Sequence, residues 1–157
     1  MDITFKTENH TLNVRAAAII IHNNKVLMHR NVNEIYHALL GGRVELGESS
    51  ADTVKREVME ELGKEVEITG YCCTIENFFN FRNSEYHEIM FVHFAEFTNE
   101  DDKKIEETLK NIEGREDLEY RWLDLDKIEE YEIRPEVMKK VLADRIFPVH
   151  VVNDDRK

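Results

Sequence analysis

Cysteine and proline are scarce in this chain: of 157 residues, only two are cysteine and two are proline. Cys72 and Cys73 are adjacent, and neighbouring side chains of a strand point to opposite faces, so we expect no disulfide between them. Two reduced thiols suit a reducing compartment. A chain of this length can bury a core without disulfides. No repeat or Pro/Gly/Ser-rich linker divides it, so we expect one domain over residues 1–157.

Long hydrophobic runs are also missing. The purest run, Ala16 to Ile21, has six residues, whereas a membrane span needs roughly 18. The first residues, Met1 to Lys6, lack the basic-then-apolar plan of a secretory signal. We therefore expect a cytoplasmic protein that makes no membrane contact.

Positive charge is in short supply. The chain has 21 Lys and Arg against 33 Asp and Glu, a net charge of −12. This balance argues against binding long nucleic acids, which rests on Lys and Arg neutralising phosphates. An acidic protein that acts on a phosphate anion must screen the repulsion locally, and bound divalent cations do this directly.

The hydrophobic pattern predicts strands mixed with helices. Short apolar or alternating segments predict strands at 14–21, 26–28, 66–81, 86–97 and 120–123, with Arg82 to Glu85 as a hairpin turn. Several connections are too short for a βαβ crossover. The pattern therefore favours an α/β sandwich with a mixed sheet over a doubly wound parallel one.

Two helices are expected. Ser49 and Asp52 resemble a capping box before an apolar stripe that ends at Leu62, and Gly63 stands where a helix stops. Pro135 suits the first turn of a second helix, whose inward residues would be Val137, Val141 and Ile146. Residues 100–112 are ambiguous between a helix and a mobile insertion, since helical spacing of Ile105, Leu109 and Ile112 coincides with high acidity.

Three carboxylates of the first helix fall on one side of it. Glu57, Glu60 and Glu61 stand at i, i+3 and i+4, where like charges repel by a few tenths of a kcal/mol. Glu61 lies about 20° from Val54, at the edge of the apolar stripe. A carboxylate there should be paired, protonated or bound to a metal. Hard divalent cations would reverse the repulsion, and pairing with Arg56 in an ordinary salt-bridged helix is the alternative.

The wider spacing around these residues is specific. Gly42, Glu48, Arg56-Glu57-Val58, Glu60-Glu61 and Gly63 resemble the signature of the Nudix hydrolase family residue for residue. Two positions depart from it: Lys64 stands where a bulky apolar residue is usual, and no proline accompanies Gly41-Gly42. The resemblance implies a Nudix-type α/β/α sandwich with a mixed sheet and a catalytic loop–helix–loop.

The resemblance also implies roles for these residues. One or more Mg²⁺ or Mn²⁺ ions would be held against a diphosphate, and Arg56 would orient a glutamate while Glu48 supports the site. The metal ligands implied are Glu57, Glu60, Glu61 and the Gly42 carbonyl. The general base stays open between Glu57 in the helix and a late loop, where Glu116 and Glu119 are the candidates.

Substrate contacts are less specific. Arg43 and Arg82, with Arg15 and Arg30, are candidates for phosphate binding, and surface solvation is the ordinary alternative for each. Phe79 and its aromatic neighbours Phe78, Phe81 and Tyr86 are candidates for stacking a base, although strand packing is the commoner role of such residues. We assign no catalytic role to His37 or His87.

The function expected from the resemblance is metal-dependent hydrolysis of a diphosphate bond in a small nucleotide. Nucleoside triphosphates, ADP-ribose and nucleotide sugars are all open as substrates, because specificity resides in loops rather than in the signature. A non-catalytic nucleotide-binding regulator with the same fold is the alternative, followed by a plain interaction domain with an acidic helix. Similar proteins often form homodimers, but no residue here indicates one.

Overall fold

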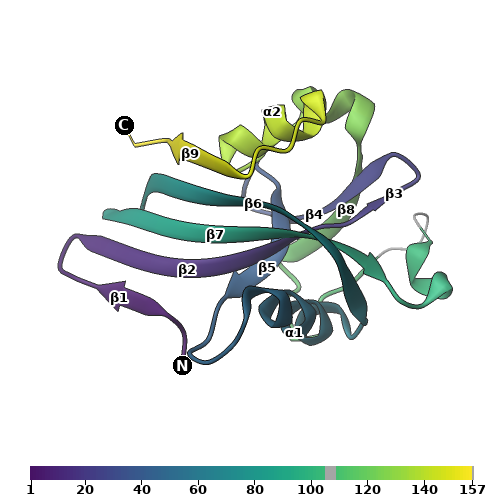
Figure 1. Ribbon diagram of the computed structural model, residues 1–157, viewed down its shortest axis with the longest axis horizontal. Coiled ribbons are helices and arrows are strands. Elements are labelled where there is room, and N and C mark those ends of the chain that lie inside the picture. Colours follow the sequence, from purple (N-terminus) through teal and green to yellow (C-terminus); the bar gives the residue numbers. More distant parts are fainter. Residues whose placement is uncertain (105–108, 157) are drawn as a thin grey trace.

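A mixed β-sheet with helices on both faces forms the frame of the protein in a computed structural model that describes residues 1–104 and 109–156 (Figure 1). The long helices are α1 (Ser50–Leu62) and α2 (Glu136–Asp144), and short 3₁₀ helices are η1 (Glu100–Lys103) and η2 (Leu125–Glu130). The strands are β1 (Thr4–Lys6), β2 (His10–Ile19), β3 (Ile21–His22), β4 (Lys25–Asn31), β5 (Ala38–Arg43), β6 (Val66–Phe81), β7 (Ser84–Phe97), β8 (Leu118–Asp124) and β9 (His150–Asp154).

Strand order explains how distant segments meet. The path across the sheet is β3-β4-β5-β2-β7-β6-β9, with β1 beside β2 and β8 beside β4. Strand β2 runs parallel to β7 and β6 runs parallel to β9, whereas the β2–β5, β4–β8 and β6–β7 pairs are antiparallel. The expected mixed sheet is therefore confirmed.

Alternate residues of the central strand supply the two cores. Ala16 and Ala18 of β2 pack with Val54 and Val58 of α1 on one face. Ala17 and Ile19 pack with Met138 and other residues of α2 on the other face. Figure 1 shows α1 and α2 on opposite sides of the sheet, which is the expected α/β/α layering. No helix within the described residues is long and apolar enough to cross a membrane.

Helix α1 begins and ends as its sequence predicts. The Ser49 side chain accepts a hydrogen bond from the Asp52 backbone N–H at 3.1 Å and so satisfies one free donor of the first turn. At the other end Gly63 adopts the left-handed conformation, with φ of 67°, and its N–H donates to the Met59 carbonyl. This left-handed exit favours glycine because a side chain there would be strained.

Several expected boundaries were wrong. The strand expected over 14–21 is two strands, β2 and β3, and the hairpin turn is only Arg82-Asn83, whose φ angles of 48° and 63° suit a two-residue turn. Helix α2 ends at Asp144, so Ile146 lies beyond it and is 68% exposed instead of pointing inward. The last residues, to which no element was assigned, form edge strand β9 on β6.

The two cysteines are free, as expected, although the expected placement of their side chains on opposite faces is wrong. Register shifts interrupt the β6–β7 ladder between Tyr71 and Cys73. Both thiols are buried in the core on the α2 side, so they do not lie on opposite faces. In the 100–112 segment the described part contains η1 and a buried Leu109, while Ile112 is exposed and Ile105 lies outside the described residues.

Candidate functional site

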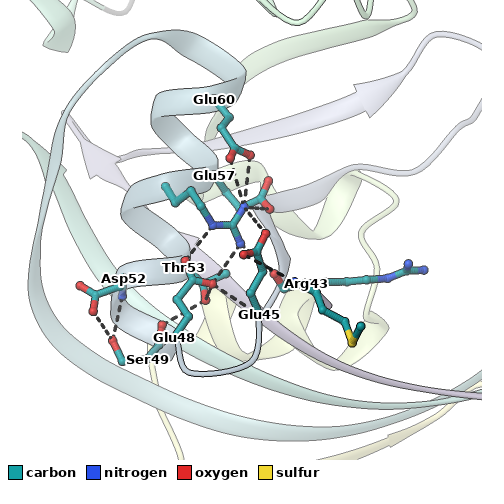
Figure 2. A network of polar contacts seen from close by, with 10 residues as sticks. Arg43, Glu45, Glu48, Ser49, Asp52, Thr53, Glu57 and Glu60 are labelled. Carbon is teal, nitrogen blue, oxygen red and sulfur yellow. Dashed lines mark hydrogen bonds and ion pairs between the residues drawn. The ribbon is translucent and has the colours of Figure 1, made fainter. Parts of the chain in front are cut away.

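Arg56 is the centre of the polar network on α1. Its Nε and Nη2 donate to the two oxygens of Glu48 at 2.7 and 3.0 Å. Its Nη1 donates to Glu57 at 3.0 Å and to Glu60 at 3.2 Å, and Nη2 also donates to the Arg43 carbonyl at 3.0 Å. Figure 2 shows the carboxylates of Glu48, Glu57 and Glu60 converging on one guanidinium group. Arg56 thus fixes the helix to the loop that precedes it.

Glu48 ties that loop together from the other side. Besides Arg56, its carboxylate accepts hydrogen bonds from the Thr53 hydroxyl at 2.8 Å and from the Glu45 backbone N–H at 3.1 Å. The hydrogen bonds from Arg56 are the main cause that lowers the pKa of Glu48 to about 2. Glu48 is therefore ionised, and both of its carboxylate oxygens accept hydrogen bonds from the protein. Its role is to support the loop.

Glu57 lies directly over the backbone of Gly42. A Cβ atom added to Gly42 would stand 2.2 Å from the carboxyl carbon of Glu57, so only glycine leaves room for that carboxylate. Gly42 is in β5 and pairs with Ala16 of β2. Burial raises the pKa of Glu57, and the positive charge of Arg56 opposes the rise. The Glu57 carboxylate of α1 therefore packs directly on strand β5.

Glu61 is the buried carboxylate that the helical spacing predicted. It is 8% exposed, and its Oε2 has no hydrogen-bond partner within residues 1–104 and 109–156. Burial, followed by the negative charges of Glu57 and Glu113, raises its pKa to about 7. A buried carboxylate with an unused oxygen is costly unless a proton or a cation occupies it. A proton or a cation would therefore stabilise this side chain, and no described residue donates a hydrogen bond to its Oε2.

The donors on α1 fit a hard divalent cation. Glu57, Glu60 and Glu61 offer carboxylate oxygens of the kind that Mg²⁺ and Mn²⁺ bind, and the unpartnered Oε2 of Glu61 is a free ligand atom. Within residues 1–104 and 109–156, no three His, Cys, Asp or Glu side chains are already gathered into a cluster. Arg56 holds Glu57 and Glu60 instead, so a cation would compete with its guanidinium.

The loop at residues 109–117, which precedes β8, lies against the end of α1. The Ile112 N–H donates to the Glu61 carbonyl at 2.8 Å, and Asn111 donates from Nδ2 to the Tyr120 hydroxyl at 3.0 Å. The carboxylate of this loop whose charge acts on Glu61 is Glu113. Sequence reasoning named Glu116 and Glu119 as the late-loop candidates.

The two late-loop candidates lie apart from this contact. The Glu116 side chain is exposed, and its N–H donates to the Gly114 carbonyl. Glu119 is engaged by Arg30, whose Nε and Nη2 approach its Oε1 at 2.8 and 2.7 Å. Among the three carboxylates, Glu113 is the one whose charge helps to raise the pKa of Glu61.

The candidate substrate residues do not form one group. Arg43 lies 3.7 Å from Asp2 near the start of the chain. Arg82 is in the β6–β7 turn over the ring of Phe81, and it helps to line a surface hollow of about 450 Å³ that contains none of the α1 glutamates. Phe79 stacks on Tyr86 with ring centroids 4.9 Å apart, which is the strand-pair packing given as the commoner alternative.

Two residues near α1, Tyr120 and His29, were not identified from the sequence as part of the site, and a third, Arg15, was named there only as one of four candidates for phosphate binding. Tyr120 of β8 hydrogen-bonds with Glu61, and burial raises its own pKa to about 12. His29 of β4 has a buried Nδ1 with no partner among the described residues, and burial, then the charge of Arg15, lowers its pKa to about 4. Arg15 of β2 also has a buried Nε that has no partner in the described part of the chain. No spacing rule could bring these strands to α1, because the sheet topology does so.

Comparison with known proteins agrees with this arrangement. Solved structures of similar fold include a NUDIX hydrolase from Nitrosomonas europaea (TM-score 0.63, 19% identity, covering 97% of this chain and 82% of that one). A MutT NUDIX hydrolase from Burkholderia pseudomallei has a TM-score of 0.62 at 20% identity, covering 86% of this chain and 98% of that one. A UDP-X diphosphatase has a TM-score of 0.58 at 15% identity, covering 92% of this chain and 69% of that one.

At these identities the structural likeness shows the fold alone. No curated protein matches the sequence. The sequence pattern of the NUDIX domain matches residues 12–144, a range that includes β5, the loop after it and all of α1. This match covers most of the chain, and the chain therefore belongs to the Nudix hydrolase family.

Proposed function

We propose that the protein hydrolyses a diphosphate bond in a small nucleotide, such as a nucleoside triphosphate, ADP-ribose or a nucleotide sugar, and that it uses Mg²⁺ or Mn²⁺. The observation that carries the proposal is Glu61, a buried carboxylate with an unpartnered oxygen beside Glu57. Membership in a family that acts on nucleoside diphosphate derivatives supports the same reaction class.

The α1 residues would hold the cation. Glu57, Glu60 and Glu61 supply the carboxylates, and the Gly42 backbone lies against Glu57. When bound, a divalent cation neutralises phosphate charge, lowers the pKa of bound water and stabilises the leaving oxygen. Arg56 keeps the carboxylates in place through its bidentate contact with Glu48, which acts as a support for the loop. We therefore assign Arg56 and Glu48 positioning roles.

The proton of the attacking water has two possible acceptors near α1. Glu57 lies over Gly42 in the helix, and Glu113 lies in the loop that closes over Glu61. Their variants separate these roles, because Glu57→Gln removes a ligand as well as a base. If Glu113 is the base, Glu113→Gln lowers turnover while Mn²⁺ affinity stays at the wild-type value.

A small nucleotide suits the charge of the protein better than a polymer does. The net charge of −12 disfavours a long nucleic acid, whose affinity rests on many Lys and Arg contacts. The UDP-X diphosphatase among the structural relatives is named for cleavage of a substrate of this size class. We therefore include nucleotide sugars with the triphosphates and ADP-ribose.

The test is product release from a panel of nucleoside triphosphates, ADP-ribose, nucleotide sugars and dinucleoside polyphosphates, resolved by chromatography. Each substrate is incubated with Mg²⁺, with Mn²⁺ and with EDTA. Turnover that EDTA abolishes is the expected result. Nucleotide binding without turnover across the panel would contradict the proposal and favour a non-catalytic regulator.

A further inference from the structure

Arg15 lies at the point where the sheet meets the α1 carboxylates. It stands in β2 directly before Ala16, which pairs with Gly42 beneath Glu57. Burial raises the pKa values of Glu57 and Glu61, and the positive charge of Arg15 opposes the rise at both. The guanidinium therefore acts electrostatically on the group of carboxylates to which we assign the cation.

The guanidinium has unused hydrogen-bonding capacity. Its Nε is buried and has no partner, and within the described part of the chain it is the sole arginine nitrogen in that condition. The carboxylate paired with it, Glu88, has its Oε2 3.9 Å from that Nε, which is beyond hydrogen-bonding distance. About 30% of the Arg15 side chain is exposed, so a ligand can reach it from solvent.

Neighbouring side chains fix the position of the Glu88 carboxylate at this distance from Arg15. It is buried in β7 and aligned with Asn77 of β6, which in turn aligns with Asn153 of β9. Asn153 donates to Asn77 at 2.8 Å and accepts from the Val137 N–H of α2 at 3.1 Å. Asn77 donates to Glu88 at 3.5 Å. This row anchors the carboxylate to α2 and leaves it facing Arg15 without satisfying it.

Two other arginines make the close carboxylate contacts that Arg15 lacks. Arg30 places two nitrogens on Glu119 at 2.8 and 2.7 Å. Arg56 is bidentate on Glu48 at 2.7 and 3.0 Å. Arg15 makes no such contact among the described residues, although carboxylates lie around it. Its planar set of donors matches the oxygens of a phosphate group.

We infer that Arg15 binds a phosphate group of the substrate diphosphate next to the α1 carboxylates, with Glu88 as the fixed counter-charge behind it. The inference rests on the proposed function, because it names the residue that contacts the anion to be cleaved. Such a contact also supplies a local positive charge to a protein whose net charge is −12. Neither Arg43 nor Arg82, two of the other candidates for phosphate binding named from the sequence, offers a buried unpartnered donor among the described residues.

The experiment measures binding of a diphosphate that cannot be hydrolysed. Methylenediphosphonate is titrated by calorimetry into the protein at saturating Mn²⁺, and Mn²⁺ affinity is measured separately by electron paramagnetic resonance. Arg15→Gln should weaken methylenediphosphonate binding roughly ten- to a hundredfold, as expected for lost hydrogen bonds to a charged group. Mn²⁺ affinity should change by less than about threefold, because Arg15 donates nothing to the cation.

Arg156→Gln is the matched control, since it removes the same charge from an exposed arginine that pairs with Asp154. Its affinity for methylenediphosphonate should equal that of the wild type, whereas equal affinity in Arg15→Gln overturns the inference. If Arg15→Gln does not fold, Arg15→Lys decides: it keeps the charge without the planar fork and should bind less tightly, and unchanged affinity overturns the inference. A wild-type protein that does not bind the probe overturns it as well.

Turnover separates this inference from the proposed function. Metal-dependent turnover combined with probe binding that does not depend on Arg15 refutes only the Arg15 contact. Probe binding that depends on Arg15, without turnover of any panel substrate, refutes only the hydrolysis. In an active protein, the KM of Arg15→Gln should rise by the same factor as its affinity falls.

Discussion

Replacing Glu61 with glutamine should stabilise the metal-free protein at alkaline pH. Burial, with the charges of Glu57 and Glu113, raises the pKa of Glu61 from its ordinary value of 4.5 to about 7. As pH rises between these values the unfolded chain loses its proton first, so the folded state loses stability through this window. At ~1.4 kcal/mol for each tenfold change in proton affinity, the loss amounts to about 3 kcal/mol above pH 7.

Glutamine does not titrate, so a Glu61→Gln protein does not lose this stability as pH rises. In EDTA, Glu61→Gln should be about 2–3 kcal/mol more stable than the wild type at pH 8, allowing for an imperfectly paired amide. The two proteins should be equally stable near pH 4.5. Urea unfolding at both pH values measures the difference, and Glu67→Gln, an exposed glutamate of β6, is the control that should show none.

Added Mg²⁺ should reverse the order at pH 8, because a ligand that binds only the folded state stabilises it and the variant lacks one carboxylate. A Glu61→Gln protein that is no more stable than the wild type at pH 8 in EDTA would refute the reasoning. That result would mean that the Glu61 carboxylate has partners or solvent that the described contacts do not include.

Three further predictions concern the surroundings of Glu61. Gly42→Ala should lower turnover at least tenfold, because its Cβ would stand 2.2 Å from the Glu57 carboxyl carbon; Gly41→Ala, whose Cβ would meet backbone at 2.0 Å, should instead destabilise the fold in a urea titration. Glu48→Gln should destabilise the protein by about 2–3 kcal/mol at pH 7. Arg56 lowers the pKa of Glu48 to about 2, so that stability is present above pH 4.5 and is lost as pH falls toward 2. Arg56→Lys should cost about 2 kcal/mol in thermal or urea unfolding, because an ammonium cannot form the bidentate contact with Glu48; an unchanged midpoint would contradict this.

Local spacing was enough to predict α1 and its carboxylates. The Ser49 cap, the Gly63 exit and the burial of Glu61 all follow from rules that act within one or two helical turns. The cluster of Arg56 with Glu48 was less accessible. Its members are eight residues apart, and the path of the loop between them, rather than helical periodicity, brings them together.

Long-range pairing explains what sequence reasoning missed. His29 and Tyr120 lie opposite each other on the neighbouring strands β4 and β8, and β5 separates these strands from β2, so the order in the sheet differs from the order in the chain. The tail strand β9 adds to β6 as an edge, where short strands leave a weak signal in the sequence. Glu113 was not singled out from the sequence, because a hydrophobic pattern does not show which carboxylate of a loop lies close enough for its charge to act on Glu61.

The central claim is that the carboxylates of α1 hold the cation that cleaves a diphosphate. The most direct test is steady-state turnover of the best panel substrate by the wild type, Glu60→Gln and Glu61→Gln, each with saturating Mg²⁺ and with EDTA. The account predicts a loss of about a hundredfold or more in each variant with the fold intact, and complete loss in EDTA. Unchanged turnover in both variants would contradict the assignment of the metal ligands.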